Sequence, residues 1–319
     1  MRCSLFPGVN AWASGKTKSD DNCANHEFEL DQSEFFSSLL DSVKFEKGIA
    51  LMLEARNITV NYGTREAVAN ISLSTKPGEV IAIIGPNGAG KSTLLRALNG
   101  SVVPTGGEVL LDGNPLRSYP RRVIARHIAV VAQEAELRFP VTVMEFVIGG
   151  RYAWSSAWGW ESEQDVEVAR AILRETELDE FEARLMNEMS GGERQRAVLA
   201  RALATEAKVF LLDEPTANLD LAHQATMLRL VRSRCDARGS AAVVVTHDVN
   251  LAAEFADRVM LLKDGQMIAM GSAREVLTSE LLKRVFDLQV LVDAHPVTGA
   301  PRITPVHGVV PSPSGRGLG

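Results

Sequence analysis

The sequence of 319 residues lacks several features that whole classes of protein require. No apolar run reaches the about 18 residues that cross a bilayer, since the best stretches, Val80–Ile84 and Ala241–Val245, have the length of a strand. We therefore expect any contact with a membrane to go through a partner. Positive charge is not in excess either, because 34 Lys and Arg against 40 Asp and Glu leave a net charge of −6. Such a chain is a poor candidate for binding nucleic acid through bulk charge.

Cysteine is scarce as well. Cys3, Cys23 and Cys235 are too few and too scattered for a disulfide framework or a zinc site. What is present is ordinary, because 45% hydrophobic and 23% charged residues supply enough apolar material for a folded core. This composition excludes disorder of the whole chain.

The two ends of the chain differ from its middle. Residues 1–51 are rich in Ser, Asn and Asp and make a poor signal peptide, because the apolar stretch Leu5–Val9 is short and broken. Met52 is followed at once by a strand pattern, so we expect 1–51 to be a disordered extension or a non-native start. Residues 296–319 are rich in Pro and Gly and are expected to form an extended tail.

Between these ends, from 52 to 295, strand-like and helix-like patterns alternate. This alternation predicts a mostly parallel α/β sheet, whereas residues from about 134 to 190 lack strong strands and predict a helical subdomain inserted in that core. Strands, as continuous apolar runs, are expected at Val80–Ile84, Ile128–Ala132, Val209–Leu212 and Ala242–Thr246. Helices are expected at Lys91–Leu98, Glu163–Thr176, Glu193–Ala204, Leu221–Arg234 and Val249–Ala256.

The first chemical motif directly follows the expected strand Val80–Ile84. It fits G-x-x-x-x-G-K-[ST], a phosphate-binding loop whose glycines bring backbone N–H groups close to phosphate oxygens at a helix N-terminus. Lys91 would neutralise the β- and γ-phosphates, and Ser92 would hold Mg²⁺. The predicted nucleotide-binding residues of this loop are Gly85, Pro86, Asn87, Gly88, Ala89, Gly90, Lys91, Ser92 and Thr93.

The second motif is the apolar run Val209–Leu212 followed by two carboxylates. Beside a phosphate loop, Asp213 would organise Mg²⁺ and its waters. Glu214 would then orient or deprotonate an attacking water. A strand that ends in acidic residues is common, so this interpretation depends on the neighbouring phosphate loop.

The third motif opens another helical pattern with Ser190, Gly191, Gly192 and Glu193. Such a start leaves N–H groups at a helix N-terminus, which indicates a second anion site about 100 residues from the first. The same four residues are equally typical of an N-cap followed by an acidic first turn.

The three motifs occur in the order and spacing of the ATP-binding cassette (ABC) ATPases, which the chain resembles over about residues 53–295. The resemblance implies a P-loop NTPase fold with an N-terminal antiparallel β part. It also implies roles for four further residues. Tyr62 would stack on adenine, and Gln133 would contact Mg²⁺ and link the core to the helical insertion. Asp220 would belong to the D-loop, and His247 would contact the γ-phosphate.

In this family ATP lies between the phosphate loop of one copy and the Ser190 segment of another. The usual Leu and Gln of that segment are Met189 and Glu193 here, which are mild changes. The resemblance implies a homodimer that drives two transmembrane permease subunits, with ATP and Mg²⁺ as cofactors. It places the chain peripherally on the cytoplasmic face of a bacterial inner membrane, served by a periplasmic heme-binding protein.

The cargo follows from weaker similarities. Leu219–Gln224 and His247–Ala253 resemble the subfamily that serves iron-siderophore, cobalamin and heme uptake. Arg138–Val143 and Val292–Pro305 most resemble its heme importers, so heme is the expected cargo and siderophore-bound iron or cobalamin the alternative. A soluble, non-transport ABC ATPase is a remote alternative, because the chain has one cassette and no heptad stretch. A P-loop GTPase would need an N-K-x-D motif, which the sequence lacks.

Three tryptophans fall within seven residues of the expected helical insertion. Trp154, Trp158 and Trp160 lie where a permease would dock, and aromatic residues are enriched at protein interfaces. A local packing cluster explains their spacing equally well.

Overall fold

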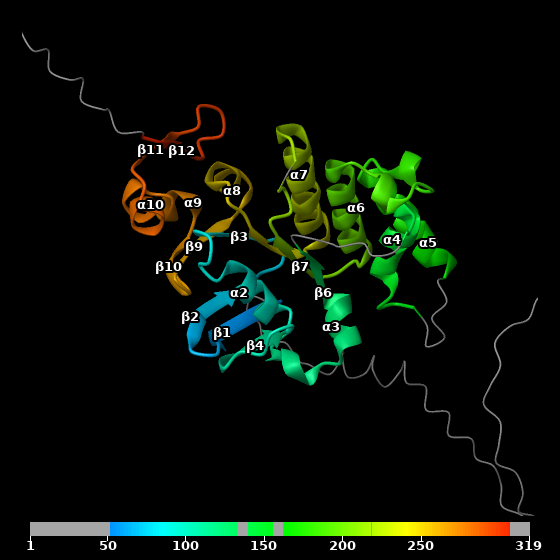
Figure 1. The fold of residues 1–319 in the computed structure, drawn as a ribbon, viewed down its shortest axis with the longest axis horizontal. Helices are drawn as coiled ribbons and strands as arrows, with labels where there is room; N and C mark the ends of the chain where they lie inside the picture. Colours follow the sequence, from blue (N-terminus) through cyan, green and yellow to red (C-terminus); the bar gives the residue numbers. More distant parts are fainter. Residues whose placement is uncertain (1–51, 133–139, 156–161, 218, 307–319) are drawn as a thin grey trace, which may run out of the picture. The chain divides into compact units, whose positions relative to one another are not determined.

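The computed structural model describes residues 52–132, 140–155, 162–217 and 219–306 (Figure 1). Residues 1–51 and Gln133 lie outside the described residues, as do Trp158 and Trp160. The predictions for these positions therefore stay predictions.

The core is a six-stranded sheet in the order β10-β9-β3-β8-β7-β6. Five of its strands are parallel, and β10 is antiparallel at one edge. Every residue of β3 and β8 is buried, as expected for apolar strands covered on both faces. The strands are β3 (Val80–Ile84), β6 (Ile128–Val131), β7 (Val209–Asp213), β8 (Ala241–Val245), β9 (Arg258–Lys263) and β10 (Gln266–Gly271).

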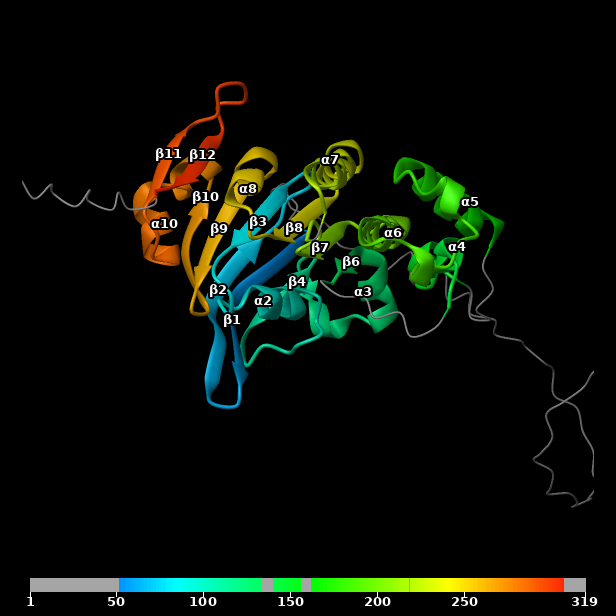
Figure 2. The same ribbon diagram turned by 45° about the horizontal axis from the view of Figure 1, so that its top comes forward.

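One face of this sheet is covered by α2 (Lys91–Leu98) and by a second, antiparallel sheet (Figure 2). Alternate residues of β3, Ile81 and Ile83, belong to the apolar core on this side. The second sheet has the order β2-β1-β4-β5, which confirms the antiparallel β part that the family resemblance implied. Its strands are β1 (Leu53–Tyr62), β2 (Arg65–Ser74), β4 (Gly106–Leu111) and β5 (Asn114–Pro115).

The opposite face packs against helices from later in the chain (Figures 1 and 2). Val80 and Ala82 of β3 point to this side, since they share apolar cores with those helices. The alternation of side chains along β3 therefore separates α2 from α6 by the thickness of the sheet. The helices are α6 (Gly191–Ala204), α7 (Leu221–Arg238), α8 (Val249–Phe255), α9 (Ala273–Val276) and α10 (Ser279–Phe286).

The described residues between 140 and 190 form short helices that pack against α6. The approach is close at Gly150, where an added Cβ would lie 2.2 Å from the carbonyl oxygen of Arg201. These elements are α4 (Val143–Ile148), η2 (Gly149–Arg151), α5 (Glu163–Glu175), η3 (Asp179–Phe181) and η4 (Met186–Glu188). Before them, η1 (Leu116–Ser118) and α3 (Arg121–His127) connect β5 to β6.

The expected tail from residue 296 needs correction. β11 (Val290–Ala294) and β12 (Pro301–Pro305) pair as an antiparallel hairpin, so the folded chain continues to at least residue 305. Asn250 of α8 explains the difference, because its amide exchanges two hydrogen bonds with the backbone of Ile303, at 2.7 and 3.1 Å. The Asn250 side chain thereby satisfies the backbone N–H and C=O of Ile303, as a neighbouring strand would. Proline is tolerated at the ends of β12, where a ladder N–H is not needed.

No helix among the described residues is both long enough and apolar enough to span a bilayer. The longest, α7, carries several charged side chains.

Candidate functional site

The loop between β3 and α2 is held close to its neighbours by glycine. An added Cβ at Gly85 would lie 2.1 Å from the carbonyl oxygen of Leu262 in β9. Gly90 has φ +99°, and a Cβ there would lie 2.3 Å from the carbonyl oxygen of Ala67 in β2. Gly90 is also the N-cap of α2 and supplies no side-chain cap. The first N–H groups of α2 are therefore without a capping side chain and can bind an anion.

Lys91 is the charged group of this loop. Its side chain is buried, and Nζ donates to the carbonyl oxygens of Gly85 (2.8 Å) and Pro86 (3.0 Å). Burial lowers the pKa of Lys91, and the nearby Glu214 and Asp213 oppose that shift. The ammonium group is thus held against the loop by neutral carbonyls and lies near two carboxylates.

Asp213 ends β7 beside Ser92, whose hydroxyl group acts to lower the pKa of the Asp213 carboxylate. Burial raises the pKa of Asp213, and the charge of Glu214 adds to the shift. Oδ1 of Asp213 is buried and has no hydrogen-bond partner among the described residues. A buried oxygen in this state is unfavourable unless a partner arrives. Hard divalent cations take oxygen ligands of this kind, so the Ser92 and Asp213 pair fits a magnesium ion.

Glu214 and His247 follow β7 and β8, whose parallel pairing brings their carboxyl ends together. Glu214 adopts φ +51°, and its N–H donates to the carbonyl oxygen of Val245 (3.0 Å). Nε2 of His247 contacts Oε1 of Glu214. The Glu214 side chain is 13% exposed and that of His247 is 48% exposed, so the pair lies at the mouth of the site. Lys91, Ser92, Asp213, Glu214 and His247 thus converge at one edge of the sheet.

Tyr62 lies at the tip of the β1–β2 hairpin. Its ring is 48% exposed, and its Cα partner across the two-residue turn is Arg65. Nη2 of Arg65 lies 3.5 Å from the carbonyl oxygen of Gly88 in the phosphate loop. Sequence reasoning missed Arg65, although the two-residue turn after Tyr62 was the signal that could have placed it there.

The Ser190 segment begins α6 and is already capped. Oγ of Ser190 accepts from the N–H of Glu193 (3.3 Å), and the N–H of Ser190 donates to Oε2 of Glu193 (2.8 Å). These bonds lower the pKa of Glu193. The N-cap interpretation of this segment is therefore confirmed for the chain by itself. A Cβ added at Gly192 would lie 3.5 Å from the side chain of Leu219, which precedes α7.

Asp220 is the N-cap of α7. Its Oδ1 accepts from the backbone N–H of His223 (2.9 Å) and lies 2.7 Å from Nδ1 of the same residue. Like Ser190, Asp220 begins a helix on the face of the sheet opposite α2. Among the described residues, no hydrogen bond or ion pair joins Ser190 or Asp220 to the phosphate loop of the same chain.

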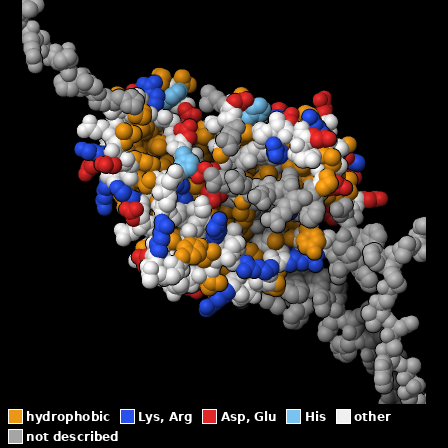
Figure 3. All heavy atoms as spheres, in the orientation of Figure 1, with side chains coloured by type: hydrophobic (Ala, Val, Ile, Leu, Met, Phe, Trp, Pro, Cys, Tyr) orange, Lys and Arg blue, Asp and Glu red, His pale blue; other side chains and the backbone are white. Residues whose placement is uncertain are grey.

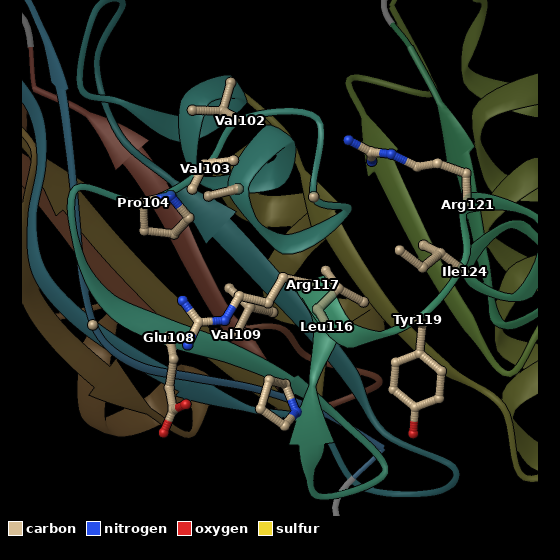
Figure 4. Close-up of a pocket in the computed structure, with 14 residues that line it drawn as sticks. Val102, Val103, Pro104, Glu108, Val109, Leu116, Arg117, Tyr119, Arg121 and Ile124 are labelled. Carbon is tan, nitrogen blue, oxygen red and sulfur yellow. The ribbon is translucent and has the colours of Figure 1, made fainter.

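A cavity of about 220 Å³ lies apart from the phosphate loop (Figure 4). It is lined mainly by apolar side chains from the segment after α2 and from β4, η1 and α3. Arg117 and Arg121 also line it. Lys and Arg side chains gather over the α3 region in the space-filling view (Figure 3). Glu108 lines it too, so the cavity combines an apolar floor with two basic groups and one acidic group.

Trp154 packs locally between α3 and the end of α6. Its indole Nε1 donates to the carbonyl oxygen of Thr205 (2.8 Å), and the guanidinium groups of Arg126 and Arg151 lie 5.0 and 5.3 Å from the ring centroid. Arg126 and Arg122 both donate from Nε to the carbonyl oxygen of Ala153, at 2.7 and 2.9 Å. For this tryptophan the packing interpretation holds, while 41% of the side chain stays exposed.

Comparisons with known proteins agree on the family. The family model described as ABC transporter matches residues 68–217. The hemin import ATP-binding protein HmuV of Thermobifida fusca is 42% identical over 256 residues, which cover 80% of this chain and 89% of that protein. The cobalamin import ATP-binding protein BtuD of Halobacterium salinarum is 40% identical, covering 80% of this chain and 64% of that protein. The ferric enterobactin transport ATP-binding protein FepC of Escherichia coli is 35% identical, covering 82% and 96%.

Solved structures give the same answer. A transporter described as metal-chelate type, in an inward-facing conformation, matches with a TM-score of 0.71 and 28% identity, covering 81% of this chain and 98% of that one. The dimeric structure of a bacterial ABC transporter cassette matches with a TM-score of 0.63 and 32% identity, covering 69% and 98%. The chain therefore belongs to the ABC transporter family and is one of its ATP-binding cassettes, an ATPase.

Proposed function

We propose that the chain is the ATP-hydrolysing subunit of an ABC importer and that the imported compound is heme. The observation that supports heme as the cargo is the recurrence of hemin import proteins among the relatives, with identities of 41 to 43% in five bacteria. The cobalamin and ferric enterobactin relatives, at 40% and 35% identity, support cobalamin or siderophore-bound iron as the alternative. The general assignment to an importer does not depend on this choice.

The nucleotide would bind across the open end of α2. Backbone N–H groups of residues 85–93 would hold the phosphates, and Lys91 would neutralise charge on the β- and γ-phosphates. Ser92 and Oδ1 of Asp213 would hold Mg²⁺, together with Gln133. When bound, the ion would neutralise charge on the phosphate oxygens. Tyr62 would stack on the adenine ring, since its exposed ring stands on the hairpin that reaches the loop.

Hydrolysis would depend on the Glu214 and His247 pair. Glu214 is mostly buried and lies beside the Ser92 and Asp213 pair, where it would take a proton from the attacking water at its carboxylate. His247, from the neighbouring strand, would orient that carboxylate and contact the γ-phosphate. Parallel pairing of β7 and β8 supports this arrangement, because it holds both side chains at one sheet edge.

Two copies would be needed for a complete site. The open N-terminus of α2 and the N-terminus of α6 lie on opposite faces of one sheet, so a single chain does not present both to one phosphate. A two-fold dimer would pair each phosphate loop with Ser190, Gly191 and Gly192 of the other copy, and would bring Asp220 to the interface. The match to a dimeric cassette supports this assembly.

Coupling to transport would use surfaces beyond the ATP site. The Arg-lined apolar cavity beside α3 would contact one of the two transmembrane permease subunits, and in the sequence α3 is followed by β6 and then Gln133. Through those subunits the chain would lie peripherally at the cytoplasmic face of the inner membrane. A periplasmic heme-binding protein would deliver the cargo.

Two experiments test the proposal. The purified chain should hydrolyse ATP slowly, and reconstitution with its permease should raise the rate. Deletion of the gene should abolish growth on heme as the sole iron source and leave growth on free iron salts unchanged. If growth on heme persists but uptake of cobalamin or a ferric siderophore fails, the importer assignment stands and the cargo is wrong. If no uptake changes, the importer assignment itself is wrong.

A further inference from the structure

We propose that Arg65 binds the α-phosphate of the bound nucleotide, an inference that rests on the proposed nucleotide site. Arg65 begins β2 and is exposed. In the described part of the chain no carboxylate lies within ion-pair distance of it. Among the described residues, its side chain makes one hydrogen bond, to the carbonyl oxygen of Gly88 at 3.5 Å, which is long and therefore weak.

The hairpin geometry directs Arg65 toward the phosphate loop. Tyr62 and Arg65 are direct Cα partners across the turn of Gly63 and Thr64. Directly opposed residues of an antiparallel pair project their side chains from the same face of the hairpin. Because Arg65 reaches Gly88, the ring of Tyr62 must leave the hairpin on the side of the phosphate loop as well.

The expected positions of the base and of the terminal phosphates show which part of a nucleotide would lie near Arg65. Tyr62 would hold the base, and Lys91 with the first turn of α2 would hold the terminal phosphates. Arg65 lies between them, at Gly88, where the chain of a nucleotide would pass from ribose to α-phosphate. A guanidinium group presents several N–H donors and recognises phosphate oxygens well. Giving up the hydrogen bond to Gly88 in order to bind a phosphate would cost Arg65 little free energy, since that bond is long.

The affinity pattern over a series of ligands separates Arg65 from its neighbours. Arg65→Ala should weaken ADP and AMP by the same factor, about tenfold, because both carry an α-phosphate, and should leave adenosine unchanged. Lys91→Ala should weaken ADP and leave AMP nearly unchanged. Tyr62→Ala should weaken all three ligands. The measurement is displacement of a fluorescent ADP analogue from the purified full-length chain in the presence of Mg²⁺.

Two further variants distinguish binding from folding. Arg65→Lys keeps the charge but loses the planar set of donors, so it should restore part of the affinity for ADP. Arg229→Ala removes one positive charge from an exposed arginine of α7 and should leave all three affinities unchanged. The thermal midpoint of Arg65→Ala should match that of the wild type, because the side chain is exposed.

The outcomes are separable. Normal binding of ADP by the wild type together with unchanged affinity in Arg65→Ala would overturn the contact alone. Equal weakening of adenosine and ADP in Arg65→Ala would also overturn it, since the variant would then act through the hairpin and Tyr62. Failure of the wild type to bind ADP would overturn the nucleotide site itself, and the Arg65 contact with it.

Discussion

The N-termini of α2 and α6 both suit phosphate, yet they are built in opposite ways. α2 begins at Gly90, in a left-handed conformation that offers no capping side chain, and Lys91 is buried beneath the loop. α6 begins with a capping box in which Ser190 and Glu193 satisfy each other's N–H groups. The first terminus is open to a ligand within one chain, whereas the second is stable by itself.

This difference indicates that the two helix N-termini have different functions. An open helix N-terminus has unsatisfied N–H groups that bind an anion directly. A capped one has less to gain from an anion and contributes only when a phosphate is brought to it. We therefore expect the α2 end to decide nucleotide affinity in the single chain. The α6 end should decide what happens once two copies meet.

The largest effect is expected from Glu214→Gln, which stops the reaction while both termini stay intact. Loss of the general base should lower ATP hydrolysis by about 100-fold or more, with ATP binding retained. ATP that is not consumed should then hold two copies together, as a dimer visible by size-exclusion chromatography with light scattering. Adding Ser190→Ala to Glu214→Gln should weaken that dimer. Normal hydrolysis in Glu214→Gln would refute the general-base assignment.

Lys91→Ala should have the next largest effect, and this effect should be on ATP binding at the N-terminus of α2. Removing the ammonium group should weaken ATP binding to the isolated chain by about 100-fold, since several charge-assisted contacts are lost together. Isothermal titration with a non-hydrolysable ATP analogue measures this. Lys283→Ala, at an exposed position of α10, is the control and should bind normally. Similar losses in Lys91→Ala and Ser190→Ala would break the proposed division between the two termini.

Ser190 variants sharpen the comparison from the α6 side. Ser190→Ala should lower the free energy of unfolding by about 1 kcal/mol through loss of the cap, whereas Ser190→Gly should lower it by only a few tenths. Both should leave ATP affinity of the single chain unchanged and reduce hydrolysis by about tenfold. Denaturant unfolding and steady-state ATPase assays measure the two properties. If Ser190→Gly hydrolyses ATP normally, the hydroxyl group acts only as a cap.

The smallest effect is expected at Asp213, which lies beside Ser92 in the first turn of α2. Burial raises its pKa, so ionisation of the folded form is unfavourable and this contribution to stability is lost as the pH rises through the raised value. Asp213→Asn should therefore raise the free energy of unfolding at pH 7 by under about 1 kcal/mol, after screening by solvent. This gain in the free energy of unfolding should become smaller as the pH is lowered toward the ordinary pKa of an aspartate, about 3.9. The measurement is denaturant unfolding in EDTA at several pH values. A loss of stability at pH 7 would show that hydrogen bonding to Ser92 outweighs burial.

Much of the site was predictable because its parts are continuous in sequence. Residues 85–93 would bind phosphate through backbone N–H groups of one loop, and β3 and α2 have the expected bounds. α6 begins two residues earlier than expected, and α7 runs four residues further. The role of Glu193 was ambiguous, since a helix start that suits an anion is also a good cap.

Other features depend on residues far apart in the chain. Arg65 reaches Gly88 only because β1 and β2 form a tight hairpin that packs over α2. The strand β12 forms because Asn250, 53 residues earlier than Ile303, pairs with it. The turn after Tyr62 is a local signal, but it does not show which part of the chain the hairpin packs against. The segment of β12 has no local signal for a strand, since Pro-rich and Gly-rich segments usually indicate loops.

The sequence by itself determined the chemistry of this protein: a phosphate loop, a strand with two carboxylates and a second helix start, each set by neighbouring residues. The tertiary structure decided how these parts are used. Parallel pairing of β7 and β8 joined Glu214 to His247, and the alternation of side chains along β3 put α2 and α6 on opposite faces. The physical reason is that a loop's conformation follows from local sterics. The face that an element covers follows instead from which apolar surfaces the whole chain can bury together.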